Sequence, residues 1–111
     1  MTDRELLELA AKAICDSATE YNERKGVWLE RAKCWWNPRD DDGDALRLAV
    51  RLHIDLNISN GISEAIWIDE ARSEYHSIEV PCDEAFEGYD AKCAATRRAI
   101  VRAAAEIGMD K

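Results

Sequence analysis

The spacing of apolar residues changes along this chain, from about one per helical turn to every second residue and back again. Helical spacing, with apolar side chains at i, i+3, i+4 and i+7, occupies residues 2–18, 41–53 and 91–107. Strand-like alternation occupies residues 54–68 and 75–80. Because each segment has one apolar face, the predicted helices and strands must cover one another around a shared core.

Polar residues at the ends of the helical segments agree with this periodicity. Thr2 and Glu5 have the spacing of a capping box. Four carboxylates stand at the start of the second helical segment: Asp40, Asp41, Asp42 and Asp44. Carboxylates there cap free amides and meet the positive end of the helix dipole. Asp90 precedes the third segment as its cap, and Gly108 is placed as its C-terminal stop.

Residues 19–36 contain aromatic and β-branched side chains typical of strands, with a turn signal at Lys25-Gly26. We expect one or two strands here, ending before Pro38, which cannot donate to a strand ladder. On a strand, the adjacent Trp35 and Trp36 point to opposite faces, so one can be buried while the other faces solvent or a partner. The alternative is that both belong to the core.

The alternating segment 54–68 predicts a β-hairpin with its turn at Ser59-Asn60-Gly61. A two-residue turn would pair residue 59 with 62 and split the apolar residues between the two faces. A three-residue loop, with Gly61 in the left-handed conformation, pairs 58 with 62 and gathers the isoleucines on one face with Leu56. We therefore expect the three-residue loop.

These patterns predict an α+β fold formed by one domain that spans residues 1–111. The expected order is α-β-β-α-β-β-β-α, an antiparallel sheet of about four to five strands with three helices packed on one face. No apolar run approaches the roughly 20 residues that cross a bilayer. The N-terminus lacks the basic-then-apolar order of a secretory signal, so we expect a cytoplasmic protein without membrane contact.

The four cysteines, at positions 15, 34, 82 and 93, show no spacing typical of a metal site. No pair has Cys-x-x-Cys spacing, and neither histidine stands near a cysteine at zinc-ligand spacing. Disulfides require an oxidising compartment, and no export route is evident. We therefore expect four free thiols and no cofactor.

Each segment that resembles a catalytic or metal-binding motif departs from it in geometry. The acidic run at 40–44 resembles a calcium loop, but aligning Gly43 with the EF-hand glycine places Pro38 and Ala49 at ligand positions. An acid-x-Lys element at 90–92 resembles part of a nuclease site, yet it starts a helix instead of lying on a strand. There is no glycine-rich phosphate loop and no nucleophile elbow. We expect no catalytic residues, no metal site and no enzymatic activity.

Charge is concentrated in the middle of the chain. Residues 1–39 are balanced, residues 40–90 hold fourteen acids and three bases, and residues 91–111 hold five bases and two acids, for a net charge of −8. An acidic middle repels nucleic-acid phosphates, so direct nucleic-acid binding is not expected. It suits a partner protein with a basic surface. The alternative is a solvated acidic surface that keeps a small protein soluble.

Three stretches resemble a group of small proteins carried by tailed bacteriophages and prophages: ELLELAAKA (5–13), WNPRDDDGDALRLAV (36–50) and AATRRAIVRAAAE (94–106). The segments 16–34 and 55–90, which contain most of the expected strands, match poorly. The group has no established activity, so the resemblance implies a phage context and assigns no catalytic residues.

That context implies a small accessory protein that acts without catalysis in the bacterial cytoplasm, by binding a host protein with a basic surface. Inhibitors of bacterial defence systems, anti-CRISPR proteins among them, are similar in size and charge. The candidate partner-binding residues are an exposed member of the tryptophan pair and carboxylates of the acidic middle: Trp35, Trp36, Asp40, Asp41, Asp42, Asp69, Glu70 and Glu74. Carboxylates on alternate strand residues, about 6.6 Å apart, could imitate successive phosphates.

Two other functions remain open from the sequence. One is a small-molecule or nucleotide-binding domain with a pocket lined by Trp28, Trp35 or Trp67. The other is a homodimer formed through an uncovered sheet edge or an exposed tryptophan.

Overall fold

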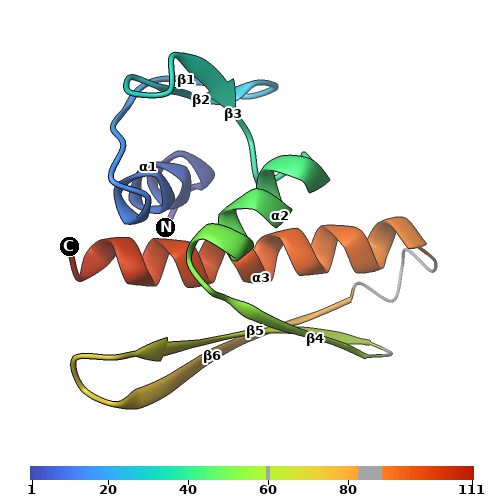
Figure 1. The fold of residues 1–111 in the computed structure, drawn as a ribbon. Coiled ribbons are helices and arrows are strands. Elements are labelled where there is room, and N and C mark those ends of the chain that lie inside the picture. Colours follow the sequence, from blue (N-terminus) through green and yellow to red (C-terminus); the bar gives the residue numbers. More distant parts are fainter. Residues whose placement is uncertain (60, 83–88) are drawn as a thin grey trace.

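The computed structural model describes residues 1–59, 61–82 and 89–111. Its elements, in chain order, are α1 (Asp3–Ala13), β1 (Ala18–Asn22), β2 (Gly26–Leu29), β3 (Cys34–Trp36), α2 (Asp42–Arg51), β4 (Asp55–Ser59), β5 (Ile62–Asp69), β6 (Glu74–Pro81) and α3 (Tyr89–Met109). The strands form two antiparallel three-stranded sheets, β1-β2-β3 and β4-β5-β6. Helix α3 lies between α1 and α2 on one side and the second sheet on the other (Figure 1).

The α+β class and the three helices agree with the sequence, but the single sheet of four to five strands is wrong. Six strands in two separate sheets are described, because residues 18–36 form three short strands where we expected one or two. Local turn chemistry allows this. The Asn22 side chain accepts hydrogen bonds from the amides of Arg24 and Lys25, at 2.9 and 3.1 Å, and closes the β1–β2 turn. Gly26 then has φ +85°, a conformation that favours glycine.

The carboxylate of Asp16 organises the second turn of the first sheet. It accepts hydrogen bonds from the amides of Ser17 and Arg31, both at 2.8 Å, and of Ala32 at 3.1 Å. Burial opposes its ionisation, but these three amide hydrogen bonds outweigh burial and hold the pKa of Asp16 below its usual value. One ionised side chain therefore fixes the chain between β2 and β3.

Helix ends follow the predicted caps more closely than the predicted lengths. Thr2 accepts a hydrogen bond from the amide of Glu5, which confirms the N-terminal cap of α1, but α1 ends at Ala13 instead of residue 18 because Cys15 takes φ +59°. Asp41 caps α2 by accepting from the amide of Asp44. Asp90 lies in the first turn of α3, which begins one residue earlier at Tyr89.

Gly108 lies inside α3, so its predicted role as a helix stop is wrong. An ideal Cβ at this position would stand 1.9 Å from the carbonyl oxygen of Leu9 and 2.8 Å from the Leu9 carbonyl carbon. The backbones of α1 and α3 thus approach one another at Gly108, where only a residue without a side chain fits.

The β4–β5 hairpin is present, but its expected three-residue loop is wrong. Ser59 pairs with Ile62 and Asp55 with Ile66, which leaves two residues between the strands, with Gly61 at φ +90°. This register turns Ser63, Ala65 and Trp67 toward α3, and all three are buried. The Ser63 and Thr96 hydroxyl groups are hydrogen-bonded at 2.9 Å across this contact. The small side chains of Ser63 and Ala65 therefore face the alanine-rich helix together with Trp67, and the isoleucines of β5 lie on the other face.

One cluster of buried residues joins the elements on both sides of α3. It includes Leu7 of α1, Val27 of β2, Leu48 of α2, Trp67 of β5 and Ile100 of α3. No helix in the described part of the chain is long and apolar enough to span a membrane.

Candidate functional site

The six predicted carboxylates lie at two separate places in the fold. Asp40, Asp41 and Asp42 precede or begin α2, whereas Asp69, Glu70 and Glu74 lie at the β5–β6 turn. Figure 1 shows these places on opposite sides of α3. The predicted set is therefore not one continuous acidic surface.

The two adjacent tryptophans lie on opposite sides of β3, as strand alternation predicts. Trp36 is buried in the core beside Val27, its neighbour on β2. Trp35 is half-buried, and its ring meets that of Trp28 edge-on, with the centroids 5.7 Å apart. Lys25 Nζ lies 5.5 Å from the Trp35 ring centroid. Only Trp35 of the pair therefore offers surface to a partner.

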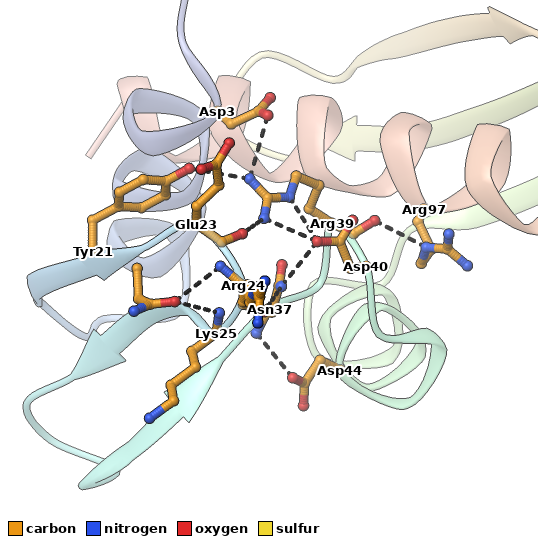
Figure 2. A network of polar contacts seen from close by, with 11 residues as sticks. Asp3, Tyr21, Glu23, Arg24, Lys25, Asn37, Arg39, Asp40, Asp44 and Arg97 are labelled. Atoms are coloured by element: carbon orange, nitrogen blue, oxygen red, sulfur yellow. Dashed lines mark hydrogen bonds and ion pairs between the residues drawn. The ribbon is translucent and has the colours of Figure 1, made fainter.

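Arg39 is the centre of a polar network that ties α1 and the β1–β2 turn to the start of α2 (Figure 2). Its Nη1 donates to the Tyr21 hydroxyl oxygen at 3.2 Å and to Asp3 Oδ2 at 3.3 Å. Its Nη2 donates to the carbonyl oxygen of Glu23 and, at 2.9 Å, to Asp40 Oδ2, which also accepts from Nε. All the hydrogen-bonding positions of the guanidinium are used within the chain.

These contacts fix the ionisation of both members of the central pair. Burial opposes the charge of Asp40, but hydrogen bonds from Arg39 and Asn37 outweigh it and hold the pKa of Asp40 below its usual value. Burial likewise opposes the charge of Arg39, but the hydrogen bonds to Asp40 and Tyr21 outweigh burial and raise the pKa of Arg39 above its usual value. The pair is a charged structural link.

The other aspartates of the run 40–44 are also engaged inside the molecule. Asp42 is ion-paired with Arg97 of α3, and Asp44 accepts from the amide of Asn37 at 2.9 Å and from Arg47 at 2.8 Å. With Asp41 capping α2, each of these carboxylates has a structural role. The fold brings Arg39 and Arg97 to this run, and partner binding by Asp40, Asp41 and Asp42 stays a prediction.

The acids at the β5–β6 turn are more open. Asp69 accepts from the amide of Ala71 at 3.1 Å and lies 3.8 Å from Arg72 Nε. Glu74 lies 3.7 Å from His76 Nε2, and Glu70 is exposed. They form the tip of a hairpin next to a surface that the sequence analysis did not identify.

That surface, here called the outer face, is the side of the β4-β5-β6 sheet turned away from α3. By strand register it consists of Asp55, Asn57, Ser59, Ile62, Glu64, Ile66, Ile68, Tyr75, Ser77, Glu79 and Pro81. All three helices lie on the other side of this sheet (Figure 1). The exposed fractions of Ile62, Ile68 and Tyr75 are 41 %, 51 % and 75 %. Large apolar side chains rimmed by polar ones are typical of interaction sites.

The charges on the outer face all have one sign. Asp55, Glu64 and Glu79 are its only charged strand residues. Glu64 and Glu79 stand directly opposite one another on β5 and β6, an arrangement that is destabilising for like charges. Neither is ion-paired with a described residue, although Asn57 Nδ2 lies 3.5 Å from Glu64 Oε1. The face therefore carries negative charge that the described chain leaves uncompensated.

A tryptophan-lined pocket is present only in a limited form. Trp67 stacks on His76, with centroids 5.5 Å apart, and both line a cavity of about 290 Å³ with Glu106. Trp28 and Trp35 contact each other instead of facing Trp67. In residues 1–59, 61–82 and 89–111, no three His, Cys, Asp or Glu side chains gather in a way that could hold a metal ion.

Comparisons with known protein families, curated proteins and solved structures find no match for this chain. Its function must therefore be inferred from its own residues.

Proposed function

We propose that this chain acts without catalysis, by binding a protein partner through the outer face of the β4-β5-β6 sheet. The observation that carries this proposal is the exposure of Ile62, Ile68 and Tyr75 beside carboxylates and no base. Burying apolar surface supplies affinity, and charge complementarity selects the partner and speeds its approach. The partner accordingly presents an apolar surface flanked by lysine or arginine.

The arrangement of charges disfavours a second copy of this chain as the occupant. Two outer faces in contact would bring Asp55, Glu64 and Glu79 of one copy against the same acids of the other. Like charges brought together at an interface cost binding energy. A basic partner instead relieves the repulsion between Glu64 and Glu79.

A bacterial host protein is the partner that the resemblance to small phage and prophage proteins favours. A surface that normally holds nucleic acid is basic and would complement the outer face. Occupying such a surface on a defence protein would inhibit it, which is the form of action we propose for this chain in the bacterial cytoplasm.

The test begins with capture of bacterial lysate proteins on the immobilised chain and continues with titration of the purified candidate. Two variants change the outer face: Glu64→Gln/Glu79→Gln, which removes the opposed charges, and Ile68→Ser, which removes apolar area. The matched control, Glu20→Gln/Glu106→Gln, removes two acids that lie elsewhere and have no ion pair with a described residue.

Both outer-face variants should weaken binding of the candidate by about tenfold or more, as loss of a central contact does. The control should bind within about twofold of the original chain, and added salt should weaken binding. Equal binding by the outer-face variants would overturn the proposal. So would loss of binding in Asp40→Asn/Asp41→Asn/Asp42→Asn alone, in a variant that keeps the circular dichroism spectrum of the original chain, because it would return the site to the start of α2.

A further inference from the structure

A cavity of about 560 Å³ on the side of α3 away from the outer face is not explained by protein binding. It lies among α1, the β1–β2 turn, the Arg39 network and α3. Its lining combines apolar side chains such as Leu6 and Val101 with charged ones that include Glu23, Arg39, Arg98 and Arg102. This volume is within the range of small-molecule sites.

The charged residues of the cavity divide into those already engaged and those that are not. Arg39 uses its donors on Asp3, Asp40 and other atoms of the chain, so these three form a fixed wall. Arg97 donates a hydrogen bond from Nε to the carbonyl oxygen of Arg39 at 2.9 Å, and its Nη1 is ion-paired with Asp42. Its Nη2 makes no hydrogen bond to a described residue.

Arg98 and Arg102 have no hydrogen bond or ion pair with any described residue. They stand four residues apart on α3, so both side chains lie along one line of the helix, beside the cavity they help to form. Two unpaired guanidinium groups at this spacing repel one another. An oxyanion between them would remove that repulsion and accept several N–H donors at once.

The carboxylate of Glu23 is the third unengaged charge. Its main-chain carbonyl accepts from Arg39, but its side chain has no partner among the described residues. Figure 2 shows Glu23 beside Arg39 and Tyr21. A ligand in the cavity therefore meets positive charge along α3 and an acceptor at the β1–β2 turn.

We propose that this cavity binds a small organic anion, whose phosphate or carboxylate group lies between Arg98 and Arg102 and whose amino or hydroxyl donors face Glu23. The apolar side chains of Leu6 and Val101 would cover its carbon skeleton. The net charge of −8 disfavours a long polyanion at this site, whereas a small anion meets mainly the local arginines.

The proposal is tested by calorimetric titration with three probes: inorganic phosphate, adenosine monophosphate and glutamate. Arg98→Gln/Arg102→Gln should weaken every probe that binds by tenfold or more, because both contacts to the oxyanion are lost. Glu23→Gln should weaken adenosine monophosphate or glutamate but not inorganic phosphate. The control Arg24→Gln/Arg47→Gln removes two arginines outside the cavity and should change nothing.

The probes also separate the two sources of the anion, since preference for the nucleotide indicates a phosphate ligand and preference for glutamate a carboxylate. Arg98 and Arg102 are exposed and without described partners, so their variants should keep the circular dichroism spectrum of the original chain. Absence of saturable binding by all three probes would overturn the proposal. So would unchanged affinity in Arg98→Gln/Arg102→Gln. Neither result bears on the outer face, which shares no residue with this cavity.

Discussion

Replacing Gly108 with alanine should destabilise this protein, although the same change in a helix usually stabilises. Alanine is favoured over glycine inside a helix by about 0.5–1 kcal/mol. At Gly108 the new Cβ would lie 1.9 Å from the Leu9 carbonyl oxygen, whereas ordinary contact begins at 3.4 Å. The backbones of α1 and α3 would have to separate by about 1.5 Å, the difference between these distances, if the new atom is to fit.

The loss of stability depends on how much packing between α1 and α3 is weakened when the two helices separate. Leu7, Ala10 and Ala11 of α1 are fully buried, and a gap of about 0.5–1 Å already forfeits a quarter to a half of a dispersion contact. Overpacking of this kind costs about 1–3 kcal/mol, and an approach as close as 1.9 Å belongs at the upper end of that range. Subtracting the helix-propensity gain of about 0.5–1 kcal/mol leaves a net loss of about 2 kcal/mol. For a chain of this size, the melting temperature would fall by about 6–10 °C.

Urea unfolding followed by circular dichroism measures this loss, and Gly43→Ala is the matched control. Gly43 lies in the first turn of α2, where the nearest atoms to a new Cβ are the Arg47 guanidinium nitrogens at 3.2 Å, which can move away. Gly43→Ala should therefore leave stability unchanged or raise it by up to about 1 kcal/mol. If Gly108→Ala proved as stable as the original chain, the close approach of α1 and α3 would be refuted.

Three further outcomes are expected. Asp16→Asn should lower stability by about 1–2 kcal/mol near neutral pH. Because the folded pKa of Asp16 lies below the unfolded value of about 3.9, the difference between variant and original, followed by urea unfolding, should be full above that pH and vanish as the pH falls through the folded pKa. Trp36→Ala should cost about 3–5 kcal/mol in the same assay, and the half-buried Trp35→Ala about 1–2 kcal/mol; equal losses would contradict their opposite placement. In a thiol-reagent time course, the exposed Cys15 and Cys34 should react before the other two free cysteines, and a reverse order would contradict their exposure.

Local signals in the sequence predicted the parts of the fold that neighbouring residues decide. The periodicity predicted three helices, and Thr2 and Asp41 cap the N-termini of α1 and α2. The third strand of the first sheet was missed because it depends on Asp16, which holds a turn fifteen residues further along. The engagement of the acidic run was missed for the same reason, since Arg97 reaches Asp42 across 55 positions. Contacts between distant residues leave no mark in the local pattern.

The error in hairpin register shows how the outer face could be found. Grouping the isoleucines of β5 with Leu56 satisfied the rule that apolar residues share a buried face. The chain instead pairs Ser59 with Ile62, and it packs small residues such as Ala65 against α3.

That choice leaves Ile62 and Ile68 exposed and sets Glu64 opposite Glu79, two arrangements that each cost folding free energy. Local rules of this kind are broken mainly at functional sites, where a partner supplies what the isolated fold lacks. An apolar, basic partner would remove both costs at once. The exposed isoleucines and the opposed carboxylates therefore favour the same face as the site of binding.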